Sequence, residues 1–336
     1  MIVQCKVILL ILIEVTSMEL EMCLGIDVSK NTLDCCLYDG ENYKHEHFKK
    51  NNEMAFKRMI KKFKLTMDCK VVMEATGVYH TKLFDYLYKA GFNVVVENPL
   101  KISSYAKMKL CRVKTDKADA KMIAEYGYTQ STMPTIPKEP YQVELASLLV
   151  LIDGYQCDLT MCKNRKEALK NYKIDVTKQL ASLNRQISSL QSEIKTLKEA
   201  TRSIVSKNCE TLYQLYRTVP GVGPVTATAV IAYFGDFSRF ELAKKAANYT
   251  GICPSPYSSG TSVRGSGSIS KKGNPLLRKS LYMAALTAAR LNKSCYDLYE
   301  RLVAKGKNKK LSRIAVAHKL LRQLFGIAKS GKVYEP

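Results

Sequence analysis

The first third of the chain alternates short apolar runs with amphipathic stretches. The pattern predicts strands at residues 23–28, 33–38, 43–48, 70–74 and 92–97. It predicts helices over about 52–65 and 79–90, with two more beginning near 101 and 115. Asp39-Gly40, which follows the second strand, predicts a tight hairpin turn. Three strands followed by alternating helices and strands predict an α/β domain.

Residues 140–215 are predicted to be helical. Apolar residues recur there at alternating spacings of four and three, which forms a narrow heptad seam: Val176, Leu180, Leu183, Ile187, Leu190, Ile194 and Leu197. Such a regular seam favours a coiled coil that joins subunits, and a helical hairpin within one chain is the alternative.

The remaining residues, 216–336, predict a mostly helical segment that a Gly/Ser-rich stretch at 257–274 interrupts. Two further helices are expected near 275–291 and 311–328. The predicted fold class is therefore α/β plus α. We expect an α/β domain at 22–135, a helical or coiled-coil region at 136–215 and a C-terminal domain at 216–336, with 1–21 as an extension of unclear role.

Charge indicates the kind of partner. The chain of 336 residues has 53 Lys and Arg against 30 Asp and Glu, for a net charge of +23, which favours a polyanion such as nucleic acid. A membrane partner is not expected, because the apolar run after Lys6 has seven residues and a spanning helix needs about 20. No small-residue cleavage site follows this run, which disfavours a signal peptide.

Cysteine and histidine give no metal-binding pattern. The eleven cysteines include no C-x-x-C pair, and this many thiols fits the reducing cytoplasm. The four histidines are scattered, and His45 and His47 alternate along a predicted strand, so we expect both at the surface.

Four acidic residues are the main candidates for chemistry. Asp27 lies in the apolar run C-L-G-I-D-V, Glu74 ends K-V-V-M-E, and Asp116 and Asp119 share one helix face in T-D-K-A-D-A. Carboxylates from separate elements are the ligands that Mg²⁺ prefers, and a pair of such ions can promote phosphodiester chemistry. The structural alternative is that Asp116 caps its helix while Asp119 is solvated.

The segment P-G-V-G-P at 220–224 precedes an apolar helix. Gly221 and Gly223 would let the backbone approach a phosphate at the helix N-terminus, as in a helix-hairpin-helix motif. An ordinary turn between helices explains the pattern equally well.

The Gly/Ser-rich stretch contains six serines: Ser258, Ser259, Ser262, Ser266, Ser268 and Ser270. Arg264, Lys271 and Lys272 lie among or just after them and could bind a phosphate while a serine attacks it. On composition alone, a flexible loop that contacts DNA or RNA is favoured over a nucleophile. From Arg264 onward the chain has 17 Lys or Arg against three acids, most densely at 305–310, which favours nucleic-acid contact.

In this order the motifs resemble those of the DEDD transposases of the bacterial IS-one-ten insertion-sequence family. The motifs are G-I-D-V-S-K, M-E-A-T-G-V-Y, K-T-D-K-A-D-A-K-M-I-A, P-G-V-G and S-G-T-S-V-R-G with I-S-K-K-G-N. The resemblance covers residues 22 to about 333. It implies a RuvC-like (ribonuclease-H-like) N-terminal domain, a coiled-coil linker and a C-terminal transposase domain.

The same resemblance implies a reaction and its residues. Asp27, Glu74, Asp116 and Asp119 would hold Mg²⁺, and Ser259, which precedes a glycine, would be the nucleophile that joins to DNA. Ser258 stands where the family can have an acidic residue, so the serine register within 258–262 stays open. The implied activity is excision and site-specific insertion of an insertion sequence, guided by a structured bridge RNA and carried out by a homo-oligomer, a dimer or tetramer.

Two alternatives remain from the sequence. One is a RuvC-like Mg²⁺-dependent nuclease or junction resolvase that cuts by activated water and needs no serine. The other is a nucleic-acid-binding protein without catalysis, which the intact acidic quartet disfavours.

Overall fold

The computed structural model describes residues 22–75, 77–111, 115–255, 258–259, 263–264 and 268–336. It divides into two compact units, Met1–Pro137 and Lys138–Pro336, each described by itself below. The predicted extension at 1–21 lies outside the described residues.

Unit 1 is built on a five-stranded sheet with strand order β3-β2-β1-β4-β5. Strands β1, β2 and β3 are antiparallel neighbours, while β4 runs parallel to β1 and β5 runs parallel to β4. The predicted strands and the β2–β3 hairpin are confirmed, with bounds β1 (Cys23–Val28), β2 (Leu33–Tyr38), β3 (Tyr43–Phe48), β4 (Lys70–Glu74) and β5 (Asn93–Glu97).

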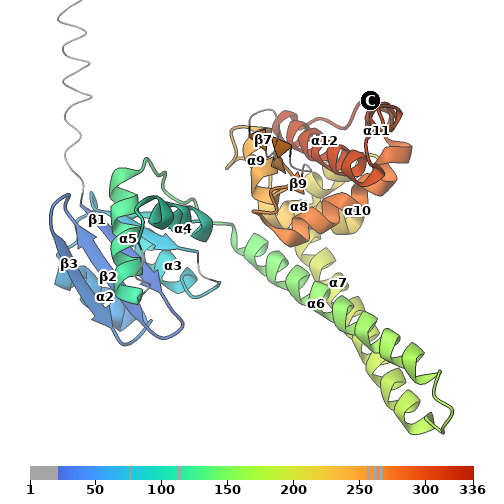
Figure 1. The fold of residues 1–336 in the computed structure, drawn as a ribbon, viewed down its shortest axis with the longest axis horizontal. Coiled ribbons are helices and arrows are strands. Elements are labelled where there is room, and N and C mark those ends of the chain that lie inside the picture. Colours follow the sequence, from blue (N-terminus) through green and yellow to red (C-terminus); the bar gives the residue numbers. More distant parts are fainter. Residues whose placement is uncertain (1–21, 76, 112–114, 256–257, 260–262, 265–267) are drawn as a thin grey trace, which may run out of the picture. The chain divides into compact units, whose positions relative to one another are not determined.

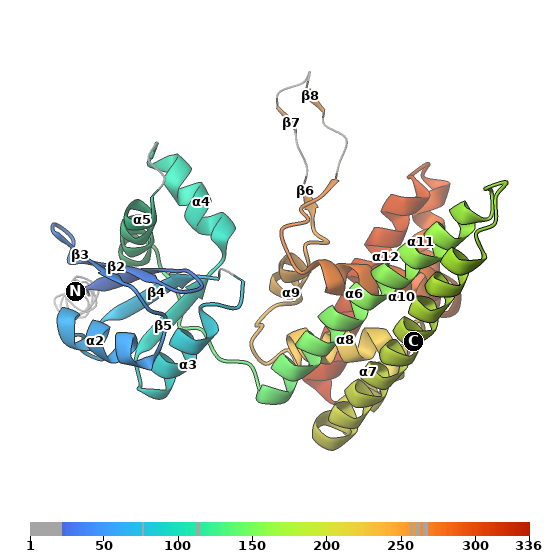
Figure 2. The ribbon, with the colours of Figure 1, turned by 90° about the horizontal axis from the view of Figure 1, so that it is seen from below.

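Helices cover both faces of this sheet (Figure 2). Two pack on one face over a core centred on Leu24, Ile26 and Phe56, and two lie on the other face. The first pair is α2 (Glu53–Phe63) and α3 (Thr81–Lys89), and the second is α4 (Pro99–Met108) and α5 (Asp116–Thr129). This three-layer arrangement is the mixed α/β fold that the sequence predicts.

Helix α5 lies unusually close to the sheet because small residues line the contact. A Cβ placed on Gly25 of β1 would come 2.2 Å from the backbone nitrogen of Ala124. A Cβ placed on Gly127 of α5 would come 2.4 Å from Val72 Cγ2. Side chains at these two positions would force the helix away from the sheet.

Unit 2 begins with a long helical hairpin, α6 (Pro140–Leu169) and α7 (Thr177–Arg217), whose helices pack along each other (Figure 1). All seven residues of the heptad seam are partly or fully buried, and Cys162 Sγ of α6 lies 3.7 Å from Gln186 Oε1 of α7. The seam is thus used within one chain, which is the alternative that the pattern had disfavoured. It no longer supports a contact between subunits.

By length and composition, α6 could cross a membrane, and 22% of its most apolar stretch is buried in the structure. Its buried residues Leu145 and Leu149 belong to the core of unit 2, and it packs on the polar α7. We therefore assign α6 to the hairpin.

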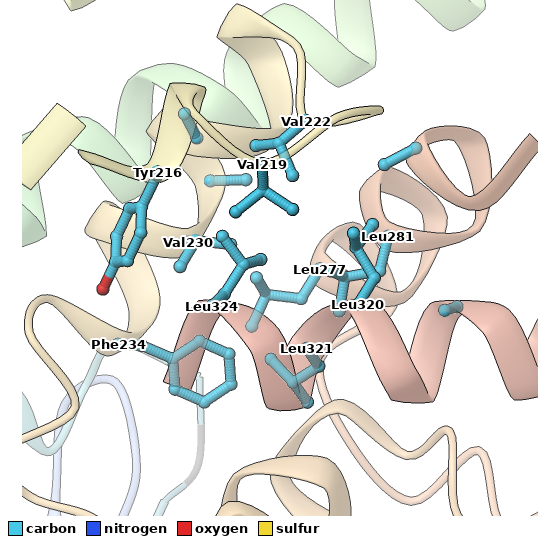
Figure 3. Packing of buried hydrophobic residues seen from close by; sticks show 14 of the residues in the cluster. Tyr216, Val219, Val222, Val230, Phe234, Leu277, Leu281, Leu320, Leu321 and Leu324 are labelled. Atoms are coloured by element: carbon cyan, nitrogen blue, oxygen red, sulfur yellow. The ribbon is translucent and has the colours of Figure 1, made fainter. Parts of the chain in front are cut away.

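In the part of unit 2 that the structure describes, five more helices pack around one apolar core (Figure 3). Tyr216 from α7, Phe234 from α8 and Leu321 from α12 meet there, and the Tyr216 hydroxyl donates to the Gly235 carbonyl at 2.6 Å. The helices are α8 (Pro224–Phe234), α9 (Ala243–Thr250), α10 (Pro275–Leu291), α11 (Lys293–Ala304) and α12 (Lys309–Ser330).

The Gly/Ser-rich stretch between α9 and α10 contains short antiparallel strand pairs. β6 (Pro254–Ser255) pairs with β9 (Ser268–Ile269), and β7 (Ser258–Ser259) pairs with β8 (Val263–Arg264). We call residues 252–271 the serine hairpin.

Candidate active site

Asp27 and Glu74 meet at one edge of the sheet. Asp27 lies at the carboxyl end of β1 and Glu74 at the carboxyl end of the neighbouring parallel strand β4, where Ile26 is the partner of Met73. Parallel register therefore places the two acids side by side, on the sheet face that α5 covers. Open α/β sheets bind ligands at the carboxyl ends of their strands.

Asp116 and Asp119 reach this edge from the first turn of α5. Thr115 caps the helix and accepts from the Ala118 amide at 3.2 Å, so Asp116 is not the cap. Asp119 is partly buried, whereas Asp116 is exposed. The structural alternative from the sequence, a capping Asp116 and a solvated Asp119, is therefore wrong. The close contact of Gly25 with Ala120 and Ala124 fixes α5 against β1 just beyond this first turn.

The electrostatics of Asp27 show that the four carboxylates are gathered. Burial, followed by repulsion from Asp119, Asp116, Glu74 and Asp34, raises the pKa of Asp27 to about 6. Repulsion of this kind requires nearby like charges. A bound cation would relieve it, so the donor set fits a hard divalent ion that prefers oxygen ligands.

The quartet is gathered more loosely than a bound ion would require. Within the described ranges, no group of three or more His, Cys, Asp or Glu side chains is arranged tightly enough to enclose a metal ion. Asp27, Glu74, Asp116 and Asp119 are the residues that would hold one.

Glu97 at the end of β5 is a further acid in register with Glu74. Its carboxylate accepts from Lys101 Nζ at 2.9 Å, the Asn98 amide at 2.8 Å and the Tyr126 hydroxyl at 3.0 Å. Lys101 balances the charge of Glu97, and all three donors engage its carboxylate oxygens. We therefore attribute Glu97 to fold stability rather than to the quartet.

Asp34 was missed by sequence reasoning. It is the cross-strand partner of Asp27, is 6% exposed, and contributes to the repulsion at Asp27. Its carboxylate oxygens lie 3.2 Å from His45 Nε2 and 3.0 Å from His47 Nδ1. His47 is exposed, as expected, whereas His45 is only partly exposed, and both histidines contact this buried acid. Their alternation on one strand, opposite an acid within an apolar strand, was the available signal.

Ser259 lies in unit 2, on β7 of the serine hairpin. Its Cα partner is Val263, and Ser258 pairs with Arg264. The candidate serines Ser262 and Ser266 lie outside the described residues. Lys271 and Lys272 are exposed at the hairpin's end.

The glycine turn between α7 and α8 is partly structural. Gly221 has a φ of 100°, and a Cβ there would come 2.6 Å from Ala288 Cβ. Gly223 is different, because a Cβ on it would meet only Arg217 Nη1 at 3.9 Å. Gly221 therefore serves packing, and of the two glycines only Gly223 is open to a ligand.

Basic residues are dense at the turn between α11 and α12. Lys305, Lys307, Lys309 and Lys310 are all exposed, and no acid lies between Glu300 and Glu335 in the sequence. This turn offers a concentrated positive surface to a polyanion.

Two family models match the chain. A DEDD transposase model of the IS110 (IS-one-ten) type matches residues 24–174, and a model described as the transposase IS116/IS110/IS902 family matches residues 213–300. The first match contains all four acids of the quartet and the second contains the serine hairpin. The chain belongs to the IS110 family of DEDD transposases. It is accordingly a DNA transposase or recombinase, an enzyme that binds DNA.

Relatives of this IS110-family transposase match over most of its length. A pilin gene-inverting protein of Moraxella lacunata is 29% identical over 93% of this chain and 97% of its own. A second protein of that name, from Moraxella bovis, is also 29% identical over the same shares. The transposase for insertion sequence element IS1111A of Coxiella burnetii is 24% identical over 82% of this chain and 79% of its own.

Proposed function

We propose that the protein excises and inserts an insertion sequence through a covalent link between Ser259 and DNA. The Ser259 Oγ–P bond forms as a phosphodiester bond of the DNA breaks. The serine proton passes to solvent, and the departing sugar oxygen takes up a proton. A sugar hydroxyl then attacks the phosphoserine, the Oγ–P bond breaks and the serine is released. The link conserves the energy of the broken bond for rejoining.

The acidic quartet is the second half of the proposal. Asp27, Glu74, Asp116 and Asp119 bind Mg²⁺, which when bound supplies charge stabilisation to the phosphate and its leaving oxygen. The single observation that supports this proposal is that Asp27 is partly buried near the three other carboxylates, so that burial and then their repulsion raise its pKa. The reaction requires both units, since the quartet belongs to unit 1 and Ser259 to unit 2.

DNA binding is proposed to use Gly223, Arg264, Lys271, Lys272 and the 305–310 turn. Target choice is proposed to come from a structured bridge RNA, as the family resemblance implies, in the bacterial cytoplasm. Strand exchange needs at least two subunits, so the active form is proposed to be a dimer or tetramer. The heptad seam does not identify a subunit contact, because α7 already packs along α6 within the chain.

An adduct assay tests the nucleophile. A donor plasmid carrying the gene with its natural flanking DNA is incubated with the protein and Mg²⁺, and protein–DNA adducts are trapped by rapid denaturation. Ser259→Ala should abolish both adduct and recombination. Ser258→Ala is the matched control on the same strand and should retain both. Recombination that persists in Ser259→Ala would refute Ser259 as the nucleophile.

The second candidate is a Mg²⁺-dependent nuclease that acts through water. The observation in its favour is that unit 1 gathers the quartet without a residue from unit 2. Mg²⁺-dependent cleavage by Ser259→Ala, with no adduct in either protein, would establish this alternative.

A further inference from the structure

Arg278 lies at the foot of the serine hairpin, in the first turn of α10. Its Nη1 lies 3.0 Å from the Thr250 carbonyl oxygen and 3.4 Å from those of Lys271 and Gly273. Thr250 lies just before the hairpin begins, whereas Lys271 and Gly273 lie just after β9, where the hairpin ends. One guanidinium nitrogen therefore joins the two ends of the hairpin, with the short bond to Thr250 as its main contact.

Backbone hydrogen bonds converge on the same place. The Lys271 amide donates to the Gly251 carbonyl at 3.1 Å, and the Asn274 amide donates to the Tyr249 carbonyl at 3.0 Å. Gly251 has a φ of 71°, and a Cβ on Gly273 would come 2.3 Å from the Tyr249 oxygen. Such close contact between two backbone segments depends on both glycines.

Beyond this foot, the hairpin residues that the structure describes form two short strand pairs. β6 and β9 pair through two residues each, as do β7 and β8. A ribbon of two such short strands is marginally stable in water. Its orientation therefore depends on how its foot is fixed, and Arg278 provides a charge-assisted contact there.

We propose that Arg278 is a positioning residue for recombination. It holds the two ends of the serine hairpin together, so that β7 presents Ser259 in one orientation to the DNA. The inference rests on the proposed function, in which Ser259 is the nucleophile. Arg278 itself acts through backbone carbonyls of the hairpin foot.

Amide hydrogen exchange in the full-length protein tests the clamp directly. The reporters are the amides of Ser270, Lys271 and Asn274, which bond across the hairpin foot. Arg278→Ala should speed their exchange about tenfold, while exchange in α8 and α12 stays unchanged. Arg278→Lys keeps a cationic donor and should restore part of the protection. Unchanged exchange at the three reporters would overturn the clamp.

Arg202→Ala is the matched control. Arg202 is another engaged arginine of unit 2, which binds Glu210 at 2.8 Å and stacks on the Tyr213 ring, away from the hairpin. Its removal should leave the three reporter amides unchanged. Faster exchange at these amides in Arg202→Ala would show a general loosening of unit 2 and would overturn a specific clamp.

Recombination on the donor plasmid supplies the functional readout. Arg278→Ala should lower the adduct-forming rate at saturating DNA by about tenfold or more, with DNA affinity within twofold of the native protein. Loss of DNA affinity with unchanged amide exchange would show that Arg278 contacts DNA, and would overturn the proposal. Faster amide exchange with an unchanged adduct-forming rate would also overturn it. Ser259→Ala separates failure of the proposed function from failure of the clamp. Recombination that persists in Ser259→Ala would refute Ser259 as the nucleophile. The exchange result for Arg278→Ala tests the clamp whatever that outcome is.

Discussion

The backbone of Gly25 in β1 lies directly against the backbone of Ala124 in α5. A Cβ on Gly25 would come 2.2 Å from the Ala124 nitrogen and 2.5 Å from the Ala120 oxygen. Since both neighbours are backbone atoms, they cannot turn aside as a flexible side chain could. This contact sets the distance between the sheet, which carries Asp27, and the helix, which carries Asp116 and Asp119.

Gly25→Ala should therefore disturb the acidic quartet as well as the fold. Moving α5 outward separates Asp119 from Asp27 and should destabilise the protein by about 2–3 kcal/mol. Chemical denaturation measures the stability. The increase in melting temperature on adding Mg²⁺ reports whether the quartet still binds the ion.

Gly154→Ala in α6 is the control, because a Cβ there meets nothing within 4 Å. Alanine is the better helix former, so this change should stabilise the protein by up to about 1 kcal/mol. It should also leave the response to Mg²⁺ intact. Equal stability of the two alanine variants would contradict the close-packing argument.

Asp27→Asn should stabilise the metal-free protein while removing its response to Mg²⁺. The substitution removes a carboxylate that burial and four neighbouring carboxylates hold in an unfavourable charged state. Because the site is partly open to solvent, the gain should be modest, with a rise in melting temperature of about 2–4 °C. Mg²⁺ should raise the melting temperature of the native protein and leave that of Asp27→Asn almost unchanged.

The metal-free protein should lose stability as pH rises from about 4 to about 6. The pKa of Asp27 is raised to about 6 in the folded protein, whereas an unfolded aspartate titrates near pH 4. In this window the unfolded chain releases its proton first, so deprotonation favours unfolding. The difference in melting temperature between the native protein and Asp27→Asn should grow from pH 4.5 to pH 7. A constant difference would count against a raised pKa.

The strands of unit 1 could be predicted almost to the residue. C-L-G-I-D-V, L-D-C-C-L-Y and Y-K-H-E-H-F are short, β-rich and separated by turn residues, so local sequence determines them. Asp27 and Glu74 were found because each is an acid in or ending an apolar run.

The remaining features depend on contacts between distant parts of the chain. The heptad seam of α7 has the same spacing whether its partner is α6 or another subunit, so periodicity alone could not choose between them. The sequence does not show which residues of the neighbouring strands lie beside Asp34. The strand register places it between Asp27 and the two histidines. The role of Arg278 depends on the two ends of the serine hairpin, which the fold brings together.

The two glycines of the P-G-V-G-P turn should respond differently to substitution. Gly221→Ala introduces a Cβ at positive φ and 2.6 Å from Ala288 Cβ, so it should destabilise the protein by about 2 kcal/mol or more. Gly223→Ala should leave the melting temperature within about 2 °C of the native value, because only Arg217 is near. If the backbone at Gly223 approaches a phosphate, its alanine variant should bind DNA more weakly. Stability loss at Gly223 and not at Gly221 would reverse this assignment.

The lysines of the α11–α12 turn should contribute to binding mainly through phosphate charge. Substitution of both Lys307 and Lys309 by Gln should weaken DNA binding similarly for any sequence, because phosphate contacts do not read bases. The slope of log affinity against log salt should become shallower by about one for each lysine that contacts a phosphate. Fluorescence anisotropy with a labelled duplex at several salt concentrations measures this slope. Lys195→Gln, at an exposed position on α7, is the control and should leave the slope unchanged. A double variant with the native slope would show that the turn does not contact DNA.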